Sequence, residues 1–337
     1  MGLRNTVAGV ALAACSLSMM ALAGCGGGSS SATPQQTTLP RTPGTITEFS
    51  LAATPGGIAA GPDGALWFAQ ARNAVGRITP AGVVTDFVLP NANSRPDGIV
   101  AGPDGALWFT DPAQNAIGRI TTAGQTVEYP VPTAASGPTE IAVGPDGALW
   151  FTEANANAIG RATTAGQITE FPVPTANSHP VGITAGPDGA LWFTEYDAVK
   201  IGRITTAGTI TEFTTPHTGL CCLASVRPTD ITTGPDGALW FTEAASLSGY
   251  LGRITTAGQI SEFNVGASPR GGIATGADGA LWFTEGDANK IARMTTSGQG
   301  TEFPVPSAHG YPAAITLGPD HALWFTESFA AKVGTIQ

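Results

Sequence analysis

Acidic side chains recur at a fixed place in this sequence, three residues after six of its seven tryptophans. The residues at that position are Gln70, Asp111, Glu153, Glu195, Glu243, Glu285 and Glu327. Six carboxylates that converged on one opening would supply the oxygen ligands that a hard divalent cation such as Mg²⁺ prefers. Alternatively, each acid caps a turn of its own repeat and faces solvent. We expect the second arrangement for the set as a whole, with Glu327 as the candidate metal ligand.

A second set of polar residues lies just before the isoleucine in the first expected strand of each repeat, for example Ile141 in the third copy. Its members, which we expect to bind a ligand, are Arg95, Asp97, Glu140, His179, Arg227, Asp230, Arg270 and Tyr311. A catalytic base must lie within hydrogen-bond reach of the proton that it removes. Of the four histidines, His179 and His309 are the candidates for that role.

Seven copies of one unit must position these side chains. The tryptophans are Trp67, Trp108, Trp150, Trp192, Trp240, Trp282 and Trp324, spaced 41 to 48 residues apart in near-copies of Gly-Pro-Asp-Gly-Ala-Leu-Trp-Phe-Thr-Glu. A period in the low forties, made of short strands and Gly-rich turns, is typical of propeller blades. The sequence therefore predicts an all-β fold, a seven-bladed β-propeller of four-stranded antiparallel blades over residues 44–337.

The repeat begins out of phase, and this predicts how the ring closes. In the third copy, stretches rich in β-branched and apolar residues at 137–143, 148–153, 158–163 and 168–174 are separated by Gly-Pro-Asp-Gly and Thr-Ala-Gly-Gln turns. A lone strand at 45–49 precedes the first complete blade, and the chain ends on a strand near Val333. Pairing these two strands would complete the last blade and remove exposed sheet edges.

Charges beside the hairpins are expected to be structural. If Ala-Gly forms a two-residue hairpin tip, Arg161 faces Glu170, and such a cross-strand pair contributes up to about 1 kcal/mol. The same pairing is expected for Arg77 with Asp86, Arg119 with Glu128, Arg203 with Glu212, Arg253 with Glu262, and Arg293 with Glu302. The Gly-Pro-Asp-Gly hairpins and the Thr-Ala-Gly-Gln hairpins are both expected at one end of the propeller. A ligand site is therefore expected among the variable loops at the other end, here called the upper face.

Composition narrows the partners. The formal net charge is −10, which gives no basic footprint, so a nucleic-acid partner has little support. Apolar residues make up 42% of the chain and charged residues 12%, which is the balance of a packed domain. One propeller accounts for the repeats, and we expect it to act as a monomer.

The N-terminal segment is expected to be a targeting signal. Residues 1–24 contain Arg4 and an apolar run, as in a secretory signal peptide. The sequence Leu-Ala-Gly-Cys ending at Cys25 resembles a bacterial lipobox, so Cys25 is the expected lipidation site in preference to Cys15; an ordinary secretory peptide is the alternative. Residues 25–43 then form a flexible Gly-, Ser- and Pro-containing tether. The protein is expected to be anchored by lipid to a membrane of the bacterial cell envelope, facing the periplasm or the exterior.

Two further cysteines, Cys221 and Cys222, lie in the one long spacing, between Thr214 and Arg227. In an oxidising compartment they could form a vicinal disulfide or pair with another chain. A reactive thiol needs a base and a lowered pKa, and His217 is near in sequence. We prefer a loop without a catalytic role.

Three repeated motifs, Leu-Trp-Phe-Thr-Glu, Asn-Ala-Ile-Gly-Arg-Ile-Thr-Thr-Ala-Gly and Ile-Thr-Glu-Phe-Pro-Val-Pro, resemble the streptogramin B lyase (virginiamycin B lyase) family over about residues 44–337. The resemblance implies a seven-bladed propeller that linearises a cyclic depsipeptide antibiotic by Mg²⁺-dependent elimination at its ester linkage, with a His as general base. The family pattern places a His at the start of the inner strand in each of the last two blades. It also places a Glu two residues before the final His and a metal-binding Glu after the final Trp.

Compared with that pattern, the chain has a Glu at the metal-binding position and no His at either of the two positions for the general base. Glu327 stands where the metal-binding Glu is expected, whereas Gly271 and Ala313 stand at the two His positions and Tyr311 at the Glu position. The sequence therefore favours a binding module whose upper channel mouth holds a small polar ligand or a cell-envelope component. The alternative is a Mg²⁺-dependent carbon–oxygen lyase with a relocated base. A lactonase-type hydrolase is more remote, because no Ser/His/Asp signature is present.

Overall fold

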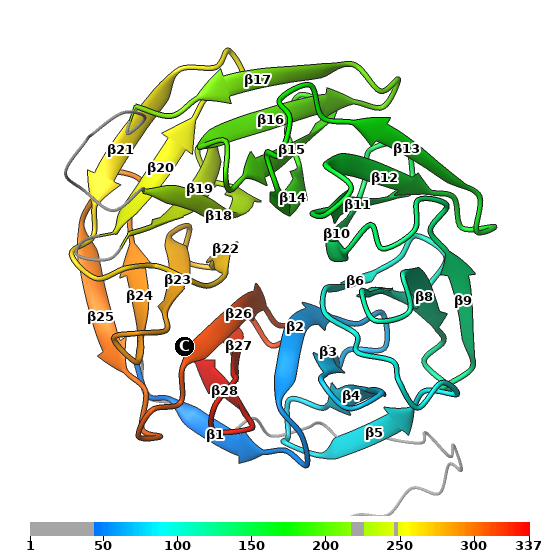
Figure 1. The fold of residues 1–337 in the computed structure, drawn as a ribbon. Helices are drawn as coiled ribbons and strands as arrows, with labels where there is room; N and C mark the ends of the chain where they lie inside the picture. Colours follow the sequence, from blue (N-terminus) through cyan, green and yellow to red (C-terminus); the bar gives the residue numbers. More distant parts are fainter. Residues whose placement is uncertain (1–43, 217–225, 246–248) are drawn as a thin grey trace, which may run out of the picture. The chain divides into compact units, whose positions relative to one another are not determined.

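The computed structural model describes residues 44–216, 226–245 and 249–337. These residues form seven four-stranded antiparallel sheets, each with its first strand on the inside of a ring (Figure 1). This confirms the predicted all-β, seven-bladed propeller. Within the described residues, no helix is long and apolar enough to span a membrane.

The strands follow one another from the centre of each blade to its rim. Blade 1 holds β2 (Pro55–Ala60), β3 (Leu66–Gln70), β4 (Ala74–Ile78) and β5 (Val84–Val88), and blade 2 holds β6 (Ile99–Ala101), β7 (Leu107–Asp111), β8 (Ala116–Ile120) and β9 (Thr126–Pro130). Blade 3 holds β10 (Pro138–Val143), β11 (Leu149–Glu153), β12 (Ala158–Ala162) and β13 (Ile168–Pro172), and blade 4 holds β14 (Pro180–Ala185), β15 (Ala190–Glu195), β16 (Lys200–Thr205) and β17 (Ile210–Thr214).

The remaining blades repeat this order. Blade 5 holds β18 (Arg227–Thr233), β19 (Leu239–Ala244), β20 (Tyr250–Ile254) and β21 (Ile260–Asn264). Blade 6 holds β22 (Ile273–Thr275), β23 (Leu281–Glu285), β24 (Lys290–Met294) and β25 (Gly300–Pro304). Blade 7 holds β26 (Pro312–Leu317), β27 (Leu323–Glu327) and β28 (Lys332–Ile336), and its outermost strand is β1 (Thr47–Ser50).

The ring closes through the pairing of the first and last strands, as predicted. In the antiparallel register of β1 with β28, Thr47 faces Thr335 and Phe49 faces Val333. Hydrogen bonds beyond the ladder extend the contact, because Gly44 N donates to Gln337 O at 2.6 Å. Blade 7 is thus built from both ends of the described chain, and no blade is left with three strands.

The predicted Arg–Glu pairs across the outer hairpins are wrong. The turn has three residues, because Thr163 N donates to Gln167 O at 2.9 Å and Gly166 N to Thr163 O at 2.8 Å, with Gly166 at a positive φ of 83°. This shifts the register by one residue, so Arg161 faces Thr169. Because a slip of one residue moves a side chain to the other face of the sheet, Arg161 and Glu170 lie on opposite faces. The same register holds for Arg77, Arg119, Arg203, Arg253 and Arg293.

Each of these arginines instead binds the Asp of the Gly-Pro-Asp-Gly or related turn between the first two strands of its blade. In blade 3, Arg161 Nε donates to Asp146 Oδ2 at 2.7 Å and Trp150 Nε1 donates to Asp146 Oδ1 at 3.0 Å. Trp150 also stacks on Phe171 with ring centroids 5.6 Å apart. Partial burial raises the pKa of Asp146, but the hydrogen bonds from Trp150 and Arg161 outweigh burial and hold it below its ordinary value.

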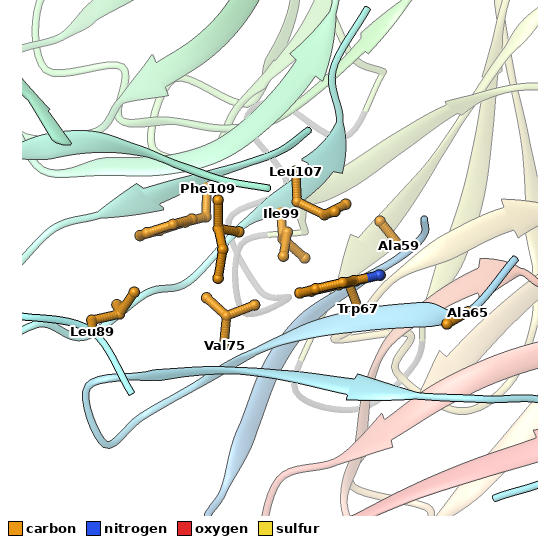
Figure 2. Packing of buried hydrophobic residues seen from close by; sticks show 9 residues of the cluster. Ala59, Ala65, Trp67, Val75, Leu89, Ile99, Leu107 and Phe109 are labelled. Atoms are coloured by element: carbon orange, nitrogen blue, oxygen red, sulfur yellow. The ribbon is translucent and has the colours of Figure 1, made fainter. Parts of the chain in front are cut away.

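The hydrophobic core lies between the blades. Because side chains alternate along a strand, Leu107 and Phe109 of β7 project from one face of blade 2 and contact the cluster that contains Trp67 of β3 in blade 1 (Figure 2). All three side chains are fully buried. Burying one such side chain stabilises the fold by about 1.5–3 kcal/mol, and the repeated packing makes a rigid wall for the channel.

Candidate functional site

A cavity of about 750 Å³ lies among the inner strands of the propeller. Its wall is formed largely by apolar and small residues, including Ile58, Ile141, Ile231 and Ile315. Four charged residues line it: Asp97, Glu140, Asp230 and Arg270. The structure therefore brings four of the eight predicted ligand-binding residues to one cavity, whereas Arg95, His179, Arg227 and Tyr311 are not among the residues that line it.

Glycines of neighbouring blades make room for two of the acids. A Cβ on Gly98 would lie 2.6 Å from Glu140 Oε2, and a Cβ on Gly182 would lie 3.0 Å from Asp230 Oδ1. Asp230 also joins two blades, because its Oδ1 accepts from Ile231 N at 2.8 Å and its Oδ2 from Ile273 N at 3.0 Å. The inner strands thus approach closely enough to hold both carboxyl groups in the channel wall.

The pKa values of all three acids are raised, and two of the acids act on the third. Burial raises the pKa of Glu140, and the negative charges of Asp230 and Asp97 raise it further. Burial also raises the pKa of Asp230, although hydrogen bonds from the backbone of Ile273 and Ile231 oppose this, and enclosure by the channel raises the pKa of Asp97. Because a carboxylate removed from water is costly without a compensating charge, the channel favours bound protons or a cation.

A second group of predicted residues gathers on the upper loops of blades 4 and 5. Arg227 forms an ion pair with Asp197 and places its guanidinium carbon 4.7 Å from the centre of the Tyr196 ring. His179 Nδ1 lies 4.0 Å from Asp197 Oδ2. His179 also has a positive φ of 55°, a backbone conformation uncommon for a residue other than glycine. Gly137 and Tyr311 stand at the same position of blades 3 and 7 with positive φ values of 66° and 53°, so this conformation belongs to the repeated loop.

The other predicted residues lie on different blades. Tyr311 stacks on Phe329 with ring centroids 4.6 Å apart, and the Phe329 side chain is 74% exposed. Arg270 Nε lies 2.9 Å from Asp287 Oδ2, and Arg95 donates its backbone N–H to Asp111 Oδ1 at 3.0 Å. His309 lies in the loop before β26 with a positive φ of 56°. Cys25, His217, Cys221 and Cys222 lie outside the described residues.

The acids that follow the tryptophans do not face solvent, so the expectation that they are solvated is wrong, although Asp111 does cap a turn of its own blade by accepting from Gln114 N at 3.2 Å. Gln70 is 2% exposed, and the six acids of the set, from Asp111 to Glu327, are 0% exposed. Each acid acts on a second acid in its own blade, for example Glu153 on Glu170 and Glu195 on Glu212. The sequence carried a signal for this pairing, since an acid on the second strand of a blade recurs with an acid on the outermost strand.

The surroundings of Glu327 decide whether it fits a metal ion. Burial raises its pKa to about 7, with a further contribution from the negative charge of Glu48. Glu48 in turn forms an ion pair with Lys332, whose Nζ lies 2.7 Å from Glu48 Oε2. Among the described residues, no group of three or more His, Cys, Asp and Glu side chains is arranged to hold a metal. The metal role of Glu327 stays a prediction.

Comparison of the sequence with known proteins shows similarity to virginiamycin B lyases. The chain matches the Virginiamycin B lyase family over residues 36–224 and 221–337. It is also 52% identical over 40 residues to a virginiamycin B lyase of Bordetella bronchiseptica, a match that covers 12% of this chain and 13% of that protein.

Solved structures extend the similarity over most of the chain. A streptogramin B lyase structure superposes with a TM-score of 0.80 at 36% identity, covering 86% of this chain and 96% of that one. The virginiamycin B lyase of Staphylococcus aureus superposes with a TM-score of 0.79 at 39% identity, covering 86% and 98%. A catalytically inactive variant of the Staphylococcus aureus enzyme, solved with quinupristin, gives the same values.

Proposed function

The chain belongs to the virginiamycin B lyase family. Within that family, we propose that it is a binding protein that holds a small polar ligand with positive charge in its channel. Lipidation at Cys25 anchors it to a membrane of the bacterial cell envelope, where a monomeric propeller faces the periplasm or the exterior. The ligand is a small molecule or a charged group of an envelope component.

The charge of the cavity carries this proposal. Asp97, Glu140 and Asp230 line it, and among the described residues of its wall Arg270 is the one basic side chain. Arg270 is already paired with Asp287. A ligand with an ammonium or guanidinium group would supply the missing positive charge, and a charge-assisted hydrogen bond to a carboxylate is stronger than one between neutral groups.

The two family base positions support binding rather than elimination. Gly271 and Ala313 carry no side chain that could remove a proton. A side chain at position 271 would also meet the fold, because a Cβ on Gly271 would lie 1.9 Å from Thr284 Oγ1 and 2.5 Å from Ala313 O. The alternative, a Mg²⁺-dependent lyase, has one observation in its favour, the placement of His179 beside Asp197 at 4.0 Å. His179 does not line the cavity that would hold the substrate.

Proton release gives a test. Because Glu140 has a raised pKa, part of its population is protonated near neutral pH, and a cation bound beside it displaces that proton. Isothermal titration calorimetry with 1,4-diaminobutane should show binding with net proton release. The number of protons released is obtained by comparing the binding enthalpy in two buffers of different ionisation enthalpy.

Glu140→Gln should weaken binding and abolish most of the release. Glu302→Gln provides the matched control, because Glu302 is a rim residue paired with Lys290 and should leave binding unchanged. Binding that is equally strong in Glu140→Gln, or a failure of small cations to bind at all, would refute the proposal.

A further inference from the structure

Glu153 of β11 is a buried acid in a blade that gives it no cation. Its residue exposure is 0%, and its two carboxyl oxygens receive no standard hydrogen bond from the described residues. The groups that act on it are Glu170 from β13 and Ser136 from the loop before β10. Blade 2 packs on this face through Trp108, Ile117 and Tyr129, and of these three only Tyr129 is titratable. Two ionised carboxylates have no donor between them, so the pair is satisfied when it holds one proton.

The strand between the two acids shows how they meet. Gly160 of β12 faces Glu170 in the ladder. A Cβ on Gly160 would lie 2.7 Å from Glu153 Oε1, so Glu153 extends over this glycine toward the outermost strand. In blade 4, Lys200 pairs with Glu212 from the first position of β16, but Ala158 stands at that position in blade 3.

In blade 1, an amide side chain stands where blade 3 has the acid Glu153. Gln70 stands at the position of Glu153, and Gln70 Nε2 donates to Asp86 Oδ1 at 2.6 Å. A Cβ on Gly76 would lie 2.6 Å from Gln70 Nε2, so the amide takes the same place over Gly76 that the Glu153 carboxyl takes over Gly160. An amide has the shape of a neutral carboxyl group and donates a hydrogen bond at every pH. Blade 1 thus shows which hydrogen bond this position makes.

The second acid of the pair holds a loop of the upper face. Glu170 Oε1 accepts from Thr133 N at 3.0 Å and Glu170 Oε2 from Thr133 Oγ1 at 3.0 Å. Thr133 lies in residues 131–137, which lead directly into the strand that carries Glu140. The same arrangement recurs in blade 4, where Glu212 accepts from Thr175 N at 2.9 Å. The charge balance of the pair is therefore connected to the position of the loop that precedes β10.

We propose that Glu153 and Glu170 share one proton and form a pH-sensitive latch that ties residues 131–137 to blade 3. At low and neutral pH, Glu153 donates its proton in a hydrogen bond to the Glu170 carboxylate, which keeps its two bonds to Thr133. Loss of the proton places two negative charges side by side in a buried site. Their repulsion moves the acids apart and releases the loop. The proposal does not depend on which ligand occupies the channel.

The sign of the effect follows from the pKa of Glu153. Burial, the hydrogen bond to Glu170 and its negative charge raise this pKa to about 8, above the ordinary value for a glutamic acid. A group whose pKa is raised in the folded state contributes stability that is complete below its unfolded pKa. That contribution declines as pH rises and is lost above about 8.

Hydrogen exchange at Thr133 tests the latch. Its amide should be protected near about pH 6, its exchange should rise by up to roughly tenfold per pH unit beyond the intrinsic pH dependence as pH approaches the pKa of Glu153, and this excess should level off above that pKa. Glu153→Gln should keep the bond to Glu170 at every pH, as Gln70 does in blade 1, and should make the protection independent of pH. Infrared spectroscopy should show a neutral carboxyl band whose intensity falls by the contribution of one carboxyl group in this variant, because other buried acids such as Glu140 and Glu327 also contribute to it.

A second variant keeps the test decisive. Gln70→Glu in blade 1 builds the same acid pair with Asp86, so its melting temperature should fall with rising pH more steeply than that of the wild type. If Glu153→Gln retains the wild-type pH dependence of Thr133 exchange, or if its infrared spectrum retains the full carboxyl band, Glu153 is not protonated and the latch does not exist.

Discussion

Ser307 holds Glu48, a residue 259 positions away, with both of its polar groups. Ser307 N donates to Glu48 Oε1 at 2.8 Å and Ser307 Oγ to Glu48 Oε2 at 2.9 Å. Lys332 joins the contact through its Nζ, which lies 2.6 Å from Ser307 Oγ. The strand that closes the ring is therefore fixed both by its ladder with β28 and by the loop between blades 6 and 7.

Deleting residues 44–50 should open the ring. The deletion removes β1, leaves β28 with an unpaired edge and exposes Trp324, which stacks on Phe49 at 5.7 Å. We expect aggregation or a large fall in melting temperature, measured by size-exclusion chromatography and differential scanning calorimetry. Ser307→Ala is the milder control and should cost about 1–3 kcal/mol through its unsatisfied partner. A deletion variant that stays monomeric with the wild-type melting temperature would refute closure by β1.

Asp146→Ala should destabilise the protein by about 1–3 kcal/mol, because it leaves the buried Trp150 N–H and the Arg161 guanidinium without their acceptor. Since the folded-state pKa of Asp146 is lowered, its contribution is present above the unfolded pKa and is lost as pH falls through the folded value. Chemical denaturation of wild type and variant as a function of pH measures both effects. A difference that does not shrink in acid would exclude the ionised Asp146 as the source.

Gly271→Ala should destabilise the protein by about 1–3 kcal/mol, because a Cβ at this position meets Thr284 Oγ1 and the backbone of Ala313. Gly300→Ala in the same blade is the matched control. Its Cβ would lie 3.7 Å from the nearest atom, Arg293 O, so we expect no loss of stability. Thermal unfolding of both variants gives the comparison, and equal melting temperatures would show that blade 6 can accept a side chain at the family's histidine position.

The anchor is tested separately from the fold. Cys25→Ala should move the protein from the membrane fraction to the soluble fraction, because lipidation requires the thiol. The melting temperature of the propeller should stay unchanged, since we expect residues 25–43 to act as a tether. Fractionation followed by immunoblotting measures the distribution, and a variant that remains in the membrane fraction would point to another means of attachment.

The fold could be predicted because its signals are local and repeated seven times. The Trp spacing, the Gly-Pro-Asp-Gly turns and the unpaired strand at 45–49 each report on one blade, and the ring follows from their number. The register of the outer hairpin could not be predicted in the same way. Thr-Ala-Gly-Gln suits both a two-residue and a three-residue turn, and the positive φ of Gly166 decides between them.

The site was predictable in part. Asp97, Glu140, Asp230 and Arg270 could be predicted by counting back from the inner-strand isoleucine, because the count stays within one repeat. The burial of Glu153 depends on blade 2 packing over it, so no pattern within blade 3 shows it. The recurrence of Glu153 with Glu170, and of Gln70 with Asp86, was the signal that could have revealed the acid pair.

Turnover of a streptogramin tests the central claim most directly. The purified protein is incubated with quinupristin and Mg²⁺, with and without EDTA, and the products are followed by chromatography and mass spectrometry. If the channel binds a ligand without a base at positions 271 and 313, quinupristin remains cyclic under both conditions. Conversion to a linear product of equal mass that EDTA abolishes would show that the chain is a working lyase and would contradict the account.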